Sequence, residues 1–306
     1  MARYTPQSKG ELKALVENFE IYLGDIDTSQ ITNMSTLFMG SKRPDFSGIE
    51  KWDVSNVTTM RAMFKDCKNF NHPINTWNVS KVTDMSEMFA GCTNFNQPLN
   101  AWNVSHVKNM SGIFGGTLDL IIHCDSGCVH VYSKCQKFNQ PLNSWDVPNV
   151  LDMSEMFFGA TAFNQPLNMW DVSHVKNMND MFGGATSFNQ ALNMWDVSSV
   201  TTMQGMFSGA TAFNQPLNTW DVSNVKEMAF MFRNATSFNQ PLNAWDVSNV
   251  EGIFGMFAMF DGATSFNQAL DDWDVSRVRD MENIFDNSPI LKNPPKWYKE
   301  TQDELF

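Results

Sequence analysis

Residues 70–95 read F-N-H-P-I-N-T-W-N-V-S-K-V-T-D-M-S-E-M-F-A-G-C-T-N-F, and close copies of this stretch fill most of the chain. The phrase W-[DN]-V-[SP]-x-V occurs nine times, and six of the eight gaps between its tryptophans are 25 residues. Those tryptophans are Trp52, Trp77, Trp102, Trp145, Trp170, Trp195, Trp220, Trp245 and Trp273. A fixed period of about 20–50 residues is typical of solenoids, in which each unit packs only on its neighbours. The sequence therefore predicts one elongated array, although 306 residues would ordinarily suggest two domains.

Within one unit, the spacing of the large apolar residues changes near Ser80. Around Trp77 and Val79 the apolar residues alternate, which indicates a short strand with one buried face. From Val82 the spacing becomes 3, 3, 1 and 3, which is typical of a short helix; Ser80 suits its N-cap and Gly91 its end. We therefore expect an α/β solenoid of about ten strand–turn–short-helix units, similar to a leucine-rich repeat, with a parallel sheet on one face. A β-solenoid without true helices is the alternative.

The two ends of the chain differ from the repeat. Residues 1–25 are expected to form a helical cap, residues 26–288 the repeat array, and residues 289–306 a C-terminal cap whose prolines stop further stacking. One unit, between Trp245 and Trp273, is three residues longer than the period.

A larger insertion lies within residues 115–137, because Trp102 and Trp145 are 43 residues apart. Two strand-like runs around Asp125-Ser126-Gly127 predict a hairpin there. Zinc prefers four nitrogen or sulfur ligands, and the insertion meets that requirement loosely. The alternative is an irregular hairpin with incidental cysteines, and we assign no metal. The metal-like residues are His123, Cys124, Cys128, His130 and Cys135.

The net charge is −12, from 21 Lys and Arg against 33 Asp and Glu. This balance argues against nucleic-acid binding and against adsorption to anionic membranes, both of which use basic surfaces. It is compatible with a cationic partner, and it also serves solubility alone. The N-terminal stretch has no apolar run of signal-peptide length and no stretch of 18 apolar residues occurs, so we predict neither an export signal nor membrane insertion.

The residue after each tryptophan is the candidate binding position. If Trp and Val point inward, a period of two directs the residue between them outward, and stacked coils would align it into an acidic column. Such a column could bind a basic protein, an amine-bearing glycan or Ca²⁺. The alternative is that each aspartate bonds the backbone amides of its own turn. The residues are Asp53, Asp146, Asp171, Asp196, Asp221, Asp246 and Asp274.

Other recurring residues are interpreted as structural. The methionine columns have the spacing of a buried stripe, and the asparagines of the returns are expected to satisfy turn backbone groups. Cys67 and Cys92 share one slot, which alanine fills in later units, so we expect two buried thiols. A disulfide between adjacent coils is the alternative.

The consensus W-D-V-S-N-V-T-x-M-x-x-M-F-x-G-A-x-x-F-N-Q-P-L-N resembles the bacterial surface protein repeat of the BspA-like leucine-rich-repeat surface proteins, over about residues 26–288. The resemblance implies a non-enzymatic array at the cell surface or in secreted form that mediates adhesion or host interaction. The chain shows no export signal or anchor of the kind that surface members carry, so a cytoplasmic location is the alternative.

No G-x-S-x-G, H-E-x-x-H, P-loop or G-x-G-x-x-G motif occurs, and the five histidines do not form a catalytic set with other residues. We therefore expect no enzymatic activity and no cofactor. The expected function is that of a monomeric, adhesin-like interaction protein with a protein or glycan partner. An intracellular structural or assembly scaffold is the alternative.

Overall fold

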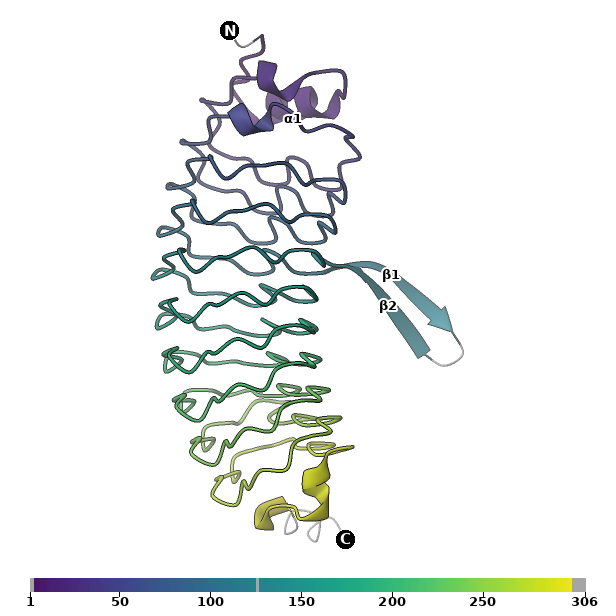
Figure 1. Cartoon of the computed structure of the whole chain (residues 1–306), viewed down its shortest axis with the longest axis vertical. Coiled ribbons are helices and arrows are strands. Elements are labelled where there is room, and N and C mark those ends of the chain that lie inside the picture. The colour runs from purple at the N-terminus through teal and green to yellow at the C-terminus, as the bar shows by residue number, and fades with distance from the viewer. Residues whose placement is uncertain (1–2, 125–126, 299–306) are drawn as a thin grey trace.

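The computed structural model describes residues 3–124 and 127–298. Successive repeats form coils stacked along one axis, with the N-terminal segment at one end and the C-terminal segment at the other (Figure 1). In the described residues, α1 spans Lys9–Glu17, and the 3₁₀ turns η1, η2 and η3 span Leu23–Asp25, Ile49–Lys51 and Pro289–Lys292. Strands β1 (Thr117–Cys124) and β2 (Gly127–Ser133) form one antiparallel pair. The regular repeats themselves are built from turns.

The backbone of each coil bonds directly to the next coil. Every second N–H in the segment 60–66 donates to a carbonyl of the segment 84–90, at N···O distances of 2.8–2.9 Å. The intervening N–H groups close turns within the coil, as Met63 does onto the Met60 carbonyl at 3.0 Å. Isolated parallel bridges join successive coils from the pair Asn33–Thr59 to the pair Thr202–Glu227. The coils are therefore held by a ladder of parallel hydrogen bonds that runs along the stack.

The strand and the short helix expected in each unit are replaced by these turns in the described coils. Ala62, Asp66 and Glu87 adopt left-handed φ angles of 52°, 57° and 56°, which an α-helix of L-residues excludes. Gly91, expected to end a helix, occupies an equivalent left-handed position with φ of 71°. The apolar residues form a buried stripe, as their spacing predicts, but alternate N–H groups along it bond the neighbouring coil and the intervening ones bond the third residue back.

The core contains the side chains that the pattern directs inward. The nine motif tryptophans are 2–4 % exposed, and rings from neighbouring coils stack, as Phe182 does on Phe207 with centroids 5.7 Å apart. Each indole N–H donates to a carbonyl of the preceding coil; Trp195 Nε1, for example, lies 3.0 Å from the Leu167 carbonyl oxygen. This bond recurs from Trp52 to Trp297 with distances of 2.8–3.1 Å. We call this series the indole ladder.

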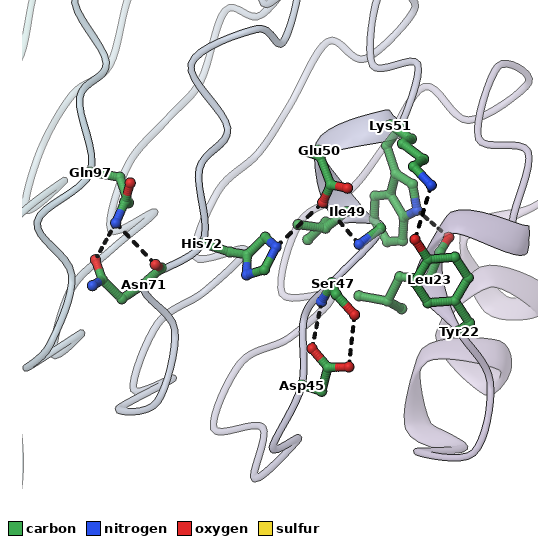
Figure 2. A network of polar contacts seen from close by, with 12 residues as sticks. Tyr22, Leu23, Asp45, Ser47, Ile49, Glu50, Lys51, Asn71, His72 and Gln97 are labelled. Atoms are coloured by element: carbon green, nitrogen blue, oxygen red, sulfur yellow. Dashed lines mark hydrogen bonds and ion pairs between the residues drawn. The ribbon is translucent and has the colours of Figure 1, made fainter.

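A second, polar ladder runs along the returns. The N–H of Asn96 donates to Asn71 Oδ1 at 2.9 Å, and the Gln97 side-chain amide donates to the same asparagine (Figure 2). The same pair of bonds recurs in later coils as far as Asn267 and Gln268. The contacts confirm a structural role for these asparagines, since they satisfy backbone groups that each turn leaves unpaired.

Different segments close the two ends of the stack. Leu12 and Val16 of α1 are buried against the first coils, and the Arg43 guanidinium, 3 % exposed, donates to the Val16 carbonyl at 3.1 Å. At the other end Trp297 stacks on Trp273 with ring centroids 6.5 Å apart. The C-terminal segment thus continues the indole ladder by one step beyond the last repeat.

The insertion leaves the stack as a hairpin arm, formed by β1 and β2 (Figure 1). The strands pair with Ile122 opposite Val129, as the sequence predicts for a hairpin, and its turn residues Asp125-Ser126 lie outside the described residues. The rings of Phe114 and Phe138, on either side of the arm, have centroids 3.9 Å apart. Equivalent rings in an uninterrupted repeat lie 4.1 Å apart. The arm therefore interrupts the chain without displacing the core.

Trp195 tests the indole ladder. Trp195→Ala is expected to lower the free energy of unfolding by about 3–5 kcal/mol, because it removes a large buried side chain and leaves a cavity. Trp195→Phe keeps most of the apolar bulk but removes one of two hydrogen bonds to the buried Leu167 carbonyl, which still accepts the Trp170 N–H at 3.1 Å, so we expect a cost of about 0.5–1.5 kcal/mol. Denaturant melts measure both changes. A loss below about 1 kcal/mol for Trp195→Ala would contradict the buried placement.

Deleting Thr117–Lys134 removes the arm and restores the 25-residue spacing between Trp102 and Trp145. We expect this variant to fold and to melt within about 5 °C of the wild type, because the core on both sides is already continuous. The matched control deletes the same number of residues, 160–177, from a regular repeat and is expected to unfold the coils around it. Thermal melts followed by tryptophan fluorescence compare the two. Loss of cooperative melting in the arm deletion would show that the arm is needed for folding.

Candidate functional site

The aspartates of the predicted binding column are all exposed. In six of them Oδ1 accepts the N–H of the serine two residues later; Asp196 accepts from Ser198 at 3.0 Å, and the others at 2.9–3.1 Å. Asp146 is the exception, because Pro148 has no N–H to donate. The column is thus a series of turn-capping side chains in which Oδ2 is not needed by the turn. We call it the aspartate column.

Hydrogen bonds within the turns lower the pKa of four aspartates of the column. The pKa values of Asp53, Asp171, Asp196 and Asp274 are lowered, first by the serine side-chain hydroxyl and then by the serine backbone N–H. For Asp196 the neighbouring charge of Asp171 acts in the opposite direction and is the smaller effect. The aspartates with lowered pKa therefore stay ionised well below neutral pH, and a ligand would meet a line of carboxylates held in fixed turns.

A second acidic group lies where the arm leaves the stack. Glu87, Glu155 and Asp180 occupy the same turn slot of their coils, with left-handed φ angles of 56°, 55° and 51°. With Lys65, and with Thr117 at the start of β1, they line a hollow of about 530 Å³. Lys65 forms an ion pair with Glu87. We call this hollow the acid pocket.

Two carboxyl groups of the acid pocket, those of Glu155 and Asp180, have raised pKa values. Burial raises the pKa of Asp180 to about 6, and the charge of Glu155 adds to the effect. The pKa of Glu155 is raised by desolvation of its carboxyl group and then by the charge of Glu87, although Glu155 is an exposed residue. Gly205 makes room for Asp180, because a Cβ there would lie 2.1 Å from Asp180 Oδ1. Partial burial, with a smaller contribution from the neighbouring carboxylate, therefore makes Asp180 titrate in mildly acidic solution.

Sequence reasoning missed the acid pocket because it treated these positions as part of a helix. The signal was present: an acidic residue stands directly before the second methionine in M-S-E-M and M-N-D-M, where Ala62, Gly112 and Gly205 stand in other units. What the pattern did not show is that a left-handed turn would bring Glu155 and Asp180 of neighbouring coils together at the base of the arm.

The three cysteines whose side chains the structure describes belong to the core. Cys67, Cys92 and Cys135 are free and buried, so Cys135 does not belong with the metal-like residues of the insertion but continues the column of Cys92. Burial raises the pKa of Cys67 to about 12, which leaves its thiol protonated and unreactive. The side chains of His123, Cys124, Cys128 and His130 lie outside the described part of the chain. Within that part, no group of three or more His, Cys, Asp or Glu side chains is placed to hold a metal ion.

None of the helices in the described residues is both long and apolar enough to span a membrane.

The stack of equivalent coils defines a repeat protein. The chain matches the family model described as Mycoplasma protein of unknown function, DUF285, in four segments, residues 11–122, 127–204, 169–259 and 190–297. These matches cover most of the chain, and the protein therefore belongs to this family; their overlap agrees with its repeat character. Neither the curated proteins nor the solved structures contain a match to this chain.

The raised pKa of Asp180 predicts a pH-dependent stability. Because its pKa is about 6 in the folded chain and near 3.8 when unfolded, its proton stabilises the fold at low pH, and this contribution is lost as pH rises toward 6. Asp180→Asn should therefore raise the free energy of unfolding at pH 7 by about 1–3 kcal/mol, with a smaller gain at pH 4. Denaturant melts at both pH values give the difference.

Asp196→Asn is the matched control, because its carboxylate has a lowered pKa and contributes stability above its unfolded pKa that is lost as pH falls. Asparagine also keeps the turn bond, as Asn78 and Asn103 do in their coils. The control should show no gain at pH 7. An equal gain for Asp180→Asn at both pH values would show that asparagine's preference for the left-handed turn, rather than the carboxylate charge, accounts for it.

Proposed function

We propose that this protein is a non-enzymatic solenoid that binds a macromolecular partner along the aspartate column. The observation that carries the proposal is the regular repetition of exposed, ionised carboxylates. Tryptophan rings of neighbouring coils between Trp145 and Trp245 lie 6.3–6.5 Å apart, so the aspartate that follows each tryptophan recurs at a similarly short interval. A partner with closely spaced positive charges, such as a basic protein segment or an amine-bearing glycan, is complementary to this surface.

The chemistry of the column favours binding over catalysis. Carboxylates with lowered pKa remain ionised at neutral pH and are poorly suited to act as general acids. Their rigid turns reduce the entropy lost when a ligand fixes them, which supports recognition of an extended charged chain. The proposal therefore assigns the protein no reaction and no cofactor, and treats the monomeric stack as the binding unit.

We further propose that the family relationship extends to the BspA-like leucine-rich-repeat surface proteins, and that the protein acts as an adhesin-like protein at the cell surface. The repeat consensus supports this location. An intracellular assembly scaffold is the second candidate, and the free thiols of Cys67 and Cys92 favour it, because disulfides are typical of exported proteins.

Binding to a soluble polycation tests the aspartate column. Asp196→Asn/Asp221→Asn is expected to weaken the affinity for a lysine-rich probe peptide about five- to tenfold at low salt, because it removes two adjacent charges and keeps the turn bonds. Glu17→Gln/Glu20→Gln changes the net charge by the same amount on the N-terminal cap and should have little effect. Equal weakening by both variants would show that net charge alone attracts the probe.

Protease treatment of intact cells separates the two locations. Cleavage of this protein on intact cells, with a cytosolic marker protected, is expected if it is exposed at the surface. Full protection would discard the adhesin-like function and favour the intracellular scaffold, for which pull-downs from cell extract would then identify candidate partners.

A further inference from the structure

The ladder of backbone hydrogen bonds between coils has a direction. Alternate N–H groups of the segment 228–234 donate to carbonyls of the segment 255–261, and those of 256–262 donate to carbonyls of 280–286. Within these segments the donors belong to the earlier coil and the acceptors to the later one, whereas just before each segment one bond runs the other way, as Lys226 N–H does onto the Thr201 carbonyl at 2.9 Å. Along the segments themselves, the first coil therefore presents carbonyl acceptors at its free edge, and the last coil presents N–H donors.

The acceptor edge of the first coil is covered by α1. The Leu37 carbonyl, which holds the position of an accepting carbonyl in later coils, accepts Lys13 Nζ at 2.9 Å. Lys9 Nζ donates to the Ser35 hydroxyl at 2.8 Å, while Leu12 is fully buried. α1 thus covers part of the acceptor edge with two lysines that flank its buried Leu12.

Among the described residues, nothing covers the donor edge of the last coil as α1 covers the first. Met281, Asn283 and Phe285 hold the positions of the donors, and their N–H groups make no hydrogen bond to the described residues. Val275, Val278 and Met281 are partly exposed, whereas their counterparts one coil earlier are at most 1 % exposed. We call Val275, Val278, Met281 and Asn283 the open edge.

The described part of the C-terminal segment closes the other side of this coil. Trp297 stacks on Trp273, and the Tyr298 ring packs edge-on against Phe285 with centroids 5.3 Å apart. These contacts bury the tryptophan side of the last coil and leave its ladder side partly exposed.

We propose that the open edge binds an extended segment of a partner protein. This segment would present the same groups that each coil presents to the preceding coil. That segment would supply backbone carbonyls on alternate residues and apolar side chains at the spacing V-x-x-V-x-x-M. The contact continues an interface that the chain already repeats along its whole length, and it uses main-chain bonds for affinity and side-chain slots for specificity. These main-chain and apolar contacts differ in kind from the ionic contacts proposed for the aspartate column, which adjoins the open edge at Asp274 and Val275.

A second copy of the chain is a poorer occupant. Along the donor segment two open edges placed together offer donors to each other, and the Leu37 carbonyl at the acceptor edge of a second copy already accepts Lys13. The complementary occupant is therefore a segment of a different protein whose carbonyl edge is free.

The probe is a labelled synthetic peptide that copies residues 222–235, V-S-N-V-K-E-M-A-F-M-F-R-N-A, which bonds the preceding coil in the intact chain. Fluorescence anisotropy with the full chain is expected to show saturable binding. Val278→Lys should weaken it at least about tenfold, because it places a charge in an apolar slot. Met194→Lys, at a residue that is 73 % exposed in mid-array, should leave it unchanged. No saturable binding, or equal weakening by both variants, would overturn the proposal.

Hydrogen exchange in the wild type gives a second readout that needs no substitution. The amides of Met281 and Asn283 should exchange quickly in the free chain and slowly with saturating peptide. Unchanged exchange would overturn the proposal. Peptide binding that appears only when the chain is shortened to end at Tyr298 would identify residues 299–306 as the occupant and overturn the assignment to a partner.

Discussion

Each coil is joined to the one before it by an indole N–H that donates to a buried carbonyl. A tryptophan buried in a core needs a partner for its N–H, and in this chain the carbonyl of a leucine or isoleucine in the preceding coil supplies it. Because the bond spans two coils, it prevents one coil from sliding over the next. The same bond keeps equivalent residues of neighbouring coils aligned. Each core phenylalanine therefore stacks on the equivalent ring of the next coil, and each return asparagine bonds the equivalent asparagine.

Registration by buried contacts explains where the array tolerates change. The arm enters between Gly116 and Cys135, next to rings that keep their stacking distance, so extra chain at a turn costs the core little. By contrast, slots such as that of Trp195 are repeated with almost no variation in this chain, because each one serves the coil on both sides. An array of this kind is quasi-one-dimensional, and its surface can vary from coil to coil while its interior stays constant.

The same carboxylate chemistry behaves in opposite ways at two places on this surface. Asp196 lies at a turn that donates hydrogen bonds to it, and its pKa falls. Asp180 lies partly buried beside Glu155, and its pKa rises to about 6. The four aspartates of the column with lowered pKa values thus stay charged at neutral pH, whereas Asp180 in the acid pocket takes up a proton in mildly acidic solution. A partner that meets both would bind them with different dependence on pH.

The sequence by itself determined the period, the inward residues, the hairpin and the exposed aspartates, because burial imposes a repeating apolar pattern and Asp53 and its counterparts fall between two buried positions. It could not determine the turn geometry: spacings of three and four fit a helical stripe and a run of turns equally well. Only the tertiary structure decided that alternate N–H groups of residues 60–66 bond the next coil, that Cys135 is a core residue and that Glu155 meets Asp180. The physical reason is that each of these features depends on a contact with another coil, and a neighbouring coil can satisfy the same backbone donors that a helix would satisfy internally.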